Sequence, residues 1–266
     1  MRAGGTRPIL LCHQLVVEVP LLRIVSTGPF DPAPPPRNHT ETYAMARITL
    51  TFDNGPDRLV TPEVLDILSR EDIRSTFFVV GSRLEDPSMR ELATQAHGAG
   101  HWIGNHTYSH DVPLGRRADR DGAAQEIGRT QALIGNLAHE RQFFRPFGGG
   151  GAIGDHLLNE ACLKHLVAGG YTCVLWDSIP GDWKNPQDWV ATALDQCAAL
   201  DWALVVLHDL PTGAMDHLGE FIRIARLRGA EFVQDFPPDC VLIERGKVMR
   251  DLSAFLSDEA QRERAA

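Results

Sequence analysis

An aspartate and an asparagine stand side by side at the end of a predicted strand, where their side-chain oxygens could take part in chemistry. Residues 47–53 alternate polar and apolar side chains and are rich in β-branched and aromatic types, which predicts a strand. The turn-forming Asn54-Gly55-Pro56 ends it, because a glycine followed by a proline cannot prolong a strand. Asp53 and Asn54 are therefore left where the backbone leaves the sheet, which is where α/β folds place their active sites.

Two histidines four residues apart, His106 and His110, follow another predicted strand. This spacing brings both imidazoles to one side if the chain turns helically after the strand, and such pairs commonly chelate a divalent metal. Taken alone, the pair could be an accident of a helix surface. In a chain that also carries Asp53, we interpret it as a candidate metal site.

An arginine leaves a later apolar strand and enters a glycine-rich loop. Arg145 precedes Pro146-Phe147, and four glycines follow at 148–151. The segment could be a plain surface turn, or it could hold a guanidinium over a carboxylate beside a loop that a substrate approaches closely. No lysine follows with phosphate-loop spacing, so nucleotide binding is not predicted.

Acids and large aromatic residues share the loop after the next strand, and a single histidine ends a later one. Trp176, Asp177, Asp182 and Trp183 lie in this loop. The tryptophans could cap a barrel, or they could form flat walls that suit the faces of a sugar ring. His208, at the end of the buried-type strand that precedes it, is interpreted as an acid or a base.

Strand-like and helix-like patterns alternate along the chain from residue 47. Strands are predicted at 47–53, 75–80, 101–106, 142–145, 172–177, 203–208 and 231–236, and helices at 61–70, 87–99, 118–137, 156–168, 186–199 and 214–228. Thr61 is the expected N-cap of the first helix. This alternation implies parallel strands with crossover helices, and about seven repeats can close or nearly close a barrel.

Length and composition favour one soluble enzyme-sized domain. The chain has 266 residues, of which 43% are hydrophobic and 23% charged, and a single α/β barrel domain of about 200 to 250 residues fits. The net charge of -9 argues against a nucleic-acid or anionic-membrane partner. Residues 1–44 include a proline-rich stretch and are expected to be extended or disordered, or to result from an over-long start ahead of Met45. We expect the catalytic domain at 45–240 and a C-terminal tail at 241–266.

The cysteine pattern indicates a reducing compartment, and the apolar segments predict neither a spanning helix nor a signal peptide. The five cysteines are scattered and contain no C-x-x-C pair, so neither a disulfide framework nor a thiolate zinc site is predicted: Cys12, Cys162, Cys173, Cys197 and Cys240. No run approaches the 18 or more apolar residues of a spanning helix, and residues 8–25 make a poor signal peptide because polar and charged side chains interrupt them. We therefore expect a cytoplasmic protein, whose oligomeric state the sequence leaves open.

Taken in order over about residues 47–236, these motifs resemble those of the polysaccharide deacetylase family, the NodB-homology group that forms carbohydrate esterase family 4. The first motif of that family is Thr-Phe-Asp-Asp-Gly-Pro, in which the first aspartate is the catalytic base and the second binds the metal. Asp53 matches the base, and Asn54 replaces the metal-binding aspartate. His106 and His110 match the two histidine ligands of the family. The resemblance implies a distorted (β/α)7 TIM-like barrel with a divalent metal, zinc, held weakly because Asn54 is a neutral ligand.

The later motifs of the family match with two departures. Arg145 corresponds to the arginine of an Arg-x-Pro motif that is one residue shorter here, and by resemblance it pairs with the catalytic aspartate. Asp182 would tune the catalytic histidine, and His208 would be that histidine, the general acid. A second aspartate expected three residues before Asp182 is Ile179 in this chain.

The resemblance also implies which residues meet the substrate. Phe147 and Gly148 would contact it, and Trp183 would form a wall of the groove. The implied reaction is hydrolysis of an N-acetyl amide, in which water made more acidic by the metal gives a proton to Asp53 and His208 protonates the leaving amine.

Two other functions remain open at the level of the sequence. One is a metal-poor, allantoinase-like hydrolase of a small cyclic or linear amide, which Asn54 and the missing signal peptide favour. The other is a non-catalytic carbohydrate-binding relic of a deacetylase. Asp53, Arg145 and His208 together speak against the relic, because a binding site has no need of a base and an acid.

Overall fold

The computed structural model describes residues 47–117, 119 and 121–257. The N-terminal segment at 1–44 and Cys12 lie outside the described residues, so the expectation for that segment stays a prediction. No helix in the described part is both long and apolar enough to cross a membrane.

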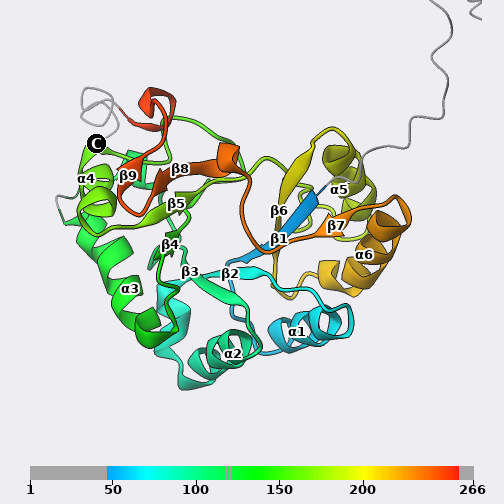
Figure 1. Cartoon of the computed structure of the whole chain (residues 1–266). Coiled ribbons are helices and arrows are strands. Elements are labelled where there is room, and N and C mark those ends of the chain that lie inside the picture. The colour runs from blue at the N-terminus through cyan, green and yellow to red at the C-terminus, as the bar shows by residue number, and fades with distance from the viewer. Residues whose placement is uncertain (1–46, 118, 120, 258–266) are drawn as a thin grey trace, which may run out of the picture. The chain divides into compact units, whose positions relative to one another are not determined.

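Parallel strands form the centre of the fold in the order β6-β1-β2-β3-β4-β5 (Figure 1). Their bounds are β1 Arg47–Asp53, β2 Thr76–Val79, β3 Trp102–Asn105, β4 Phe143–Phe144, β5 Thr172–Val174 and β6 Trp202–His208. β6 pairs with β1 along its whole length, and Asp53 lies opposite His208. The two strand ends with the clearest chemistry in the sequence are therefore neighbours in space.

An isolated parallel β-bridge between Ser178 and Val205 connects the segment after β5 with β6. The Ser178 N–H donates to the Leu204 carbonyl (3.1 Å), and the Val206 N–H donates to the Ser178 carbonyl (3.0 Å). Regular pairing with β4 is already lost after Cys173. The sheet thus curls into a distorted barrel, which confirms the predicted fold class.

The predicted seventh strand is shorter than expected. β7 (Glu231–Phe232) replaces the predicted strand at 231–236 and pairs only with Arg47 and Ile48 of β1. β6 occupies one edge of β1, and β2 takes the other edge from Thr51 onward. Only the start of β1 is therefore open to β7.

The sheet continues into the range expected to be a tail. β8 (Val241–Glu244) pairs antiparallel with β5, and β9 (Lys247–Val248) pairs antiparallel with β8. The first three residues of β8 are buried. The expected boundary at residue 241 therefore falls at the start of a strand, because this apolar segment gains burial against β5.

Helices cover the outer face of the sheet (Figure 1). Their bounds are α1 Val60–Arg70, α2 Pro87–Gly98, α3 Arg129–Ile134, α4 Glu160–Ala168, α5 Trp189–Ala198 and α6 Leu218–Leu227. Ile48, Leu50 and Phe52 of β1 pack in one cluster with the buried sides of α1, α2, α5 and α6. Since successive residues of a strand face opposite sides, Thr51 and Asp53 point into the barrel.

Two predicted helical features differ from the structure. The helix predicted at 118–137 is broken into a π-helix (Ala124–Gly128), α3 and a 3-10 turn (Gly135–Leu137). Gly135, with φ at +55°, ends α3. Thr61 is not a helix cap, because α1 begins at Val60 and the Thr61 hydroxyl donates to Asp209 instead.

Candidate active site

Asp53, at the end of β1, is buried and paired with Arg145. Arg145 Nη1 donates to Asp53 Oδ1 (2.8 Å) and to Thr51 Oγ1 (2.7 Å). Its Nε and Nη2 donate to the carbonyls of Val174 and Leu175 (3.3 and 3.2 Å), where β5 leaves regular pairing. The guanidinium is fully buried, so its fixed fork of donors holds the Asp53 carboxylate in one orientation.

The charge state of Asp53 follows from these contacts. Burial alone would raise the pKa of the carboxyl, but the positive charge of Arg145 and the hydrogen bond from its guanidinium outweigh burial and hold the pKa below its ordinary value. Asp53 is therefore a carboxylate at neutral pH and can accept a proton.

His106 and His110 come together on a turn that is not helical, contrary to the expectation. His106 directly follows β3, and both Thr107 and His110 have positive φ, +67° and +54°. The two ring centroids lie 4.9 Å apart. The left-handed residues, not a helical turn, bring the imidazoles to the same side.

The hydrogen bonds of His106 decide which of its nitrogens is free. Nδ1 lies 2.9 Å from the Arg145 carbonyl oxygen, which can only accept, so Nδ1 carries the proton. Nε2 then presents its lone pair 3.5 Å from Asp53 Oδ2. Burial lowers the pKa of His106, and burial followed by the charge of His106 lowers that of His110 to about 3. Both rings are neutral at neutral pH, as metal ligands must be.

These residues fit a divalent cation. Asn54 Oδ1 is buried and has no hydrogen-bond partner among the described residues. It lines the same cavity as the two histidines, and the lone pair of His106 Nε2 and a carboxylate oxygen of Asp53 face each other there. No three His, Cys, Asp or Glu side chains of the described chain form a metal-binding group, so the third protein ligand would be the amide of Asn54.

His208, at the end of β6, is held by Asp182 from the loop after β5. Its Nδ1 donates to Asp182 Oδ1 (2.9 Å), and its backbone N–H donates to Asp182 Oδ2 (2.9 Å). Burial lowers the pKa of His208, but the hydrogen bond and the charge of Asp182 outweigh it, so the pKa is raised above its ordinary value. No hydrogen bond from the described residues reaches Nε2, and the Trp183 ring packs edge-on against the imidazole with ring centroids 4.6 Å apart.

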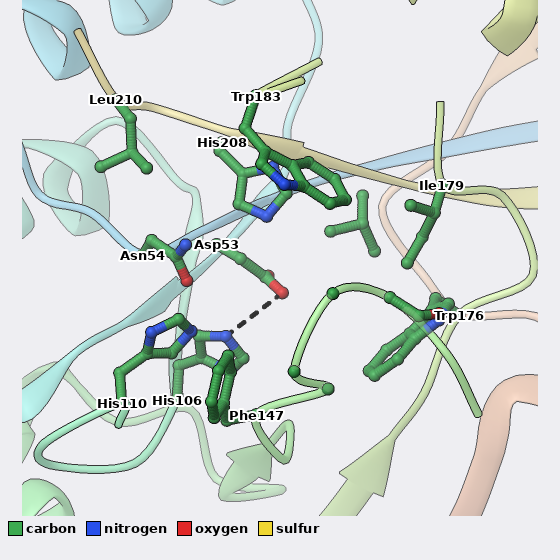
Figure 2. A pocket seen from close by; sticks show the side chains of 15 residues that line it. Asp53, Asn54, His106, His110, Phe147, Trp176, Ile179, Trp183, His208 and Leu210 are labelled. Atoms are coloured by element: carbon green, nitrogen blue, oxygen red, sulfur yellow. Dashed lines mark hydrogen bonds and ion pairs between the residues drawn. The ribbon is translucent and has the colours of Figure 1, made fainter. Parts of the chain in front are cut away.

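One cavity of about 260 Å³ joins these groups (Figure 2). The carboxylate of Asp53 points into it between the two histidines on one side and His208 with Trp183 on the other (Figure 2). Trp176 and Ile179 form its apolar end. A carboxylate, a neutral histidine pair and a histidine with a raised pKa therefore face one cavity.

The glycine loop, residues 147–151, forms the remaining wall of the cavity. Contacts with His110 and Trp176 hold it in place. Phe147 lies on His110 with ring centroids 4.0 Å apart, and the Trp176 indole N–H donates to the Gly151 carbonyl (3.0 Å). A Cβ at Gly148 would lie 2.8 Å from the Trp176 ring, which real contacts do not allow. The backbone can line the cavity here because this residue has no side chain.

The structure brings together all ten residues to which the sequence assigned a catalytic, substrate-binding or metal-binding role, whereas Asp177 from the same loop lies outside the cavity and accepts from the Leu204 N–H. Eight line the cavity, namely Asp53, Asn54, His106, His110, Phe147, Gly148, Trp183 and His208. The other two do not line the cavity but pair with residues that do: Arg145 pairs with Asp53, and Asp182 pairs with His208. Their roles remain predictions.

Sequence reasoning missed several neighbours of the site. Thr51 and Val206 each lie two residues before a predicted catalytic residue on the same strand, so the period of two could have placed them on the inner face. Leu210 lines the cavity two residues after His208. Glu126, which binds the histidine turn from outside, has no local signal in the sequence.

Comparisons with known proteins agree with this geometry. The profile of a family described as "Polysaccharide deacetylase" matches residues 41–171, which contain Asp53, both histidines and Arg145. The peptidoglycan-N-acetylglucosamine deacetylase of Bacillus cereus is 30% identical over 196 residues, or 72% of this chain and 67% of that protein. Related peptidoglycan deacetylases of Listeria monocytogenes are longer, and the chain spans 37% of their length.

Solved structures with the same fold include two enzymes of related chemistry. A peptidoglycan N-acetylglucosamine deacetylase aligns with a TM-score of 0.61 and 28% identity, covering 74% of this chain and 89% of that one. A family 4 acetyl xylan esterase from Clostridium thermocellum, solved with a cobalt ion, aligns with a TM-score of 0.57 and 27% identity, covering 70% of this chain and 87% of that one.

Proposed function

Since the chain belongs to the polysaccharide deacetylase family, we propose that it is a metal-assisted hydrolase that releases acetate from the N-acetyl amide of a sugar. The observation that carries this proposal is the pairing of a base and an acid across one cavity. Asp53, fixed by Arg145, lies on one side, and His208, fixed by Asp182, lies on the other.

Asp53 is the base in the proposed reaction. Its pKa lies below the ordinary value, so at neutral pH it is ready to take a proton from the water that attacks the amide carbon. The Arg145 guanidinium donates to Oδ1 of this carboxylate, so Oδ1 is occupied and the proton goes to Oδ2. Arg145 thereby orients the base and does not compete with water for it.

His208 is the proton donor to the leaving nitrogen. The raised pKa favours the protonated ring, and Asp182 holds Nδ1–H so that Nε2–H faces the cavity. The amide C–N bond breaks as this proton is transferred, which yields acetate and a free amine. Trp183 packs against the ring and restricts its rotation.

His106, His110 and Asn54 would hold the metal, which we propose to be zinc. When bound, such an ion polarises the amide carbonyl and lowers the pKa of water. The amide of Asn54 is a neutral ligand where a carboxylate would add a charge, so we expect weak binding. The protein contributes two neutral imidazoles and one uncharged oxygen.

The relatives favour this function over the allantoinase-like alternative, and the structure of the site favours it over a binding relic. Those described above are named deacetylases and an esterase, and an allantoinase-like activity has no support among them. A binding relic does not require the fixed Asp182–His208 pair, in which one carboxylate binds both the ring and the backbone N–H of the same histidine.

Acetate release tests the proposal. Protein stripped of metal with a chelator is incubated with N-acetylated chitooligosaccharides and peptidoglycan fragments, with and without added Zn²⁺ or Co²⁺. We expect acetate release that depends on the added ion, with Asp53→Asn as the inactive blank. Hydrolysis of a cyclic amide such as allantoin, without acetate release from any sugar, would replace this function with the allantoinase-like one.

A further inference from the structure

A buried glutamate outside the cavity binds the turn that carries the two histidines. Glu126 is 3% exposed, and its Oε2 accepts from the N–H groups of both Tyr108 and Ser109, each at 2.9 Å. Its Oε1 accepts from the Ser109 hydroxyl (2.8 Å) and lies 3.2 Å from Arg117 Nη1. Both carboxylate oxygens are therefore used on this turn and its flanking arginine.

The turn needs such a partner because of its backbone conformation. Thr107 and His110 both occupy the left-handed region, which is unfavourable for residues with a side chain. The N–H groups of Tyr108 and Ser109 lie beyond the last paired residue of β3, so the sheet does not bind them. A carboxylate that accepts from both holds the backbone between the two histidines in one conformation.

A second contact ties the same turn to the same element. Asn105, the last residue of β3, donates from Nδ2 to the Ile127 carbonyl (2.9 Å) and accepts the Thr107 N–H at Oδ1 (3.1 Å). Ile127 is the neighbour of Glu126 in the π-helix Ala124–Gly128. The π-helix therefore binds the histidine turn at its start, through Asn105, and at its middle, through Glu126.

We propose that Glu126 is a positioning residue that sets the metal affinity of the His106–His110 pair without touching the metal. The inference rests on the metal site of the proposed function. Each imidazole is fixed by another group, His106 by the Arg145 carbonyl and His110 by the Phe147 ring. The distance between them depends on the backbone that joins them. The N–H groups of Gly81 and Ser82 bind two carbonyls of that backbone, and Glu126 is the side chain that accepts its N–H groups at Tyr108 and Ser109.

The test is a Co²⁺ titration of metal-free protein, followed by the visible absorption of the bound ion. Glu126→Gln keeps the size of the side chain but replaces one acceptor oxygen with a donor, and we expect about a tenfold or greater loss of affinity, the usual effect of losing a group that orients metal ligands. Glu244→Gln is the matched control, because Glu244 also pairs with an arginine, Arg141, outside the cavity. It should bind Co²⁺ like the wild type.

Two further measurements keep the result clear. Ser109→Ala removes the hydroxyl bonds to Glu126 and Asp111 but leaves both backbone N–H bonds to Glu126 in place. It should therefore weaken Co²⁺ binding by a smaller factor, and it serves if Glu126→Gln does not fold. At saturating Co²⁺ the rate of a folded Glu126→Gln protein should return towards that of the wild type. Equal affinity of the folded variants and the wild type, or a wild type that binds no Co²⁺, would overturn the assignment. Acetate release by the wild type tests the proposed function independently of the role assigned to Glu126.

Discussion

The buried carboxyl of Asp209 should make the stability of this protein depend on pH in a way that one substitution removes. Asp209 follows His208 and is fully buried, and the Thr61 hydroxyl donates to its Oδ2. Its Oδ1 has no hydrogen-bond partner in the described part of the chain. Gly55 closes over it so tightly that a Cβ there would lie 2.2 Å from the carboxyl oxygens. Burial raises the pKa of Asp209 from 3.8 to about 7.

The size of the effect follows from this shift. The folded protein keeps the proton up to about pH 7, whereas the unfolded chain loses it near pH 3.8. The stability contributed by the neutral carboxyl is therefore fully present below pH 3.8, falls as pH rises, and is lost once the pH passes about 7. A shift of about 3 units at about 1.4 kcal/mol per unit is on the order of 4 kcal/mol in the free energy of unfolding.

The substitution is Asp209→Asn, which keeps the shape of the side chain and removes the proton equilibrium. Urea unfolding is followed by circular dichroism at intervals from pH 4 to pH 8, for metal-free wild type and variant. We expect the unfolding free energy of the wild type to fall relative to the variant by several kcal/mol over this range, because the other titrating groups are common to both proteins.

The control is Asp239→Asn, which changes a carboxylate with a 96% exposed side chain. The unfolding free energy of this variant should change with pH in the same way as that of the wild type. Parallel curves for the wild type and Asp209→Asn would refute the argument, since they would mean that Asp209 releases its proton at the same pH in the folded and unfolded states.

Three further predictions concern the cavity. Asp53→Asn should retain the fold and lose about 100-fold or more in kcat, because a positioned general base contributes at least that much; a rate above a tenth of the wild type at an unchanged Tm would contradict the assignment. His208→Gln should lose more activity on an amide than on an activated ester, and the alkaline limb of the wild-type pH–rate profile should lie above the ordinary pKa of 6.5, because the pKa of His208 is raised; an equal loss on both substrates would point to a structural role. Asn54→Asp should bind Zn²⁺ more tightly than the wild type in a side-by-side titration with His106→Ala as the blank, because it adds a negative charge at the site; equal affinity would show that Asn54 is not a ligand.

Local patterns in the sequence were enough to predict the fold class and most of the site. The alternation at 47–53 and the turn at Asn54 placed Asp53 at a strand end, because strand period and turn chemistry act over a few residues. The β-α alternation placed His208 at the end of a parallel strand, and parallel strands bring their carboxyl ends to one edge of a sheet. The resemblance then supplied the pairing of Arg145 with Asp53, which the structure contains at 2.8 Å.

The boundaries of elements depended on contacts that no local pattern carries. The barrel closes at Ser178 because its backbone bonds to β6, and β8 joins the sheet because β5 has an open edge. Thr61 has the sequence context of a helix cap, but its hydroxyl is used by Asp209, 148 positions later. Whether the Thr61 hydroxyl caps a helix or binds Asp209 is decided only when folding has brought Asp209 next to it.

The sequence by itself determined which residues could do chemistry and the order in which the strands present them. The tertiary structure decided how they are held. His106 and His110 meet through left-handed residues that Glu126 binds from a separate element, and not through the helical turn that their spacing suggested. The protonation of Asp53, His208 and Asp209 likewise follows from burial and from charges brought in by other strands and loops. Backbone strain and pKa shifts are sums over neighbours in space, and those neighbours exist only once the chain has folded.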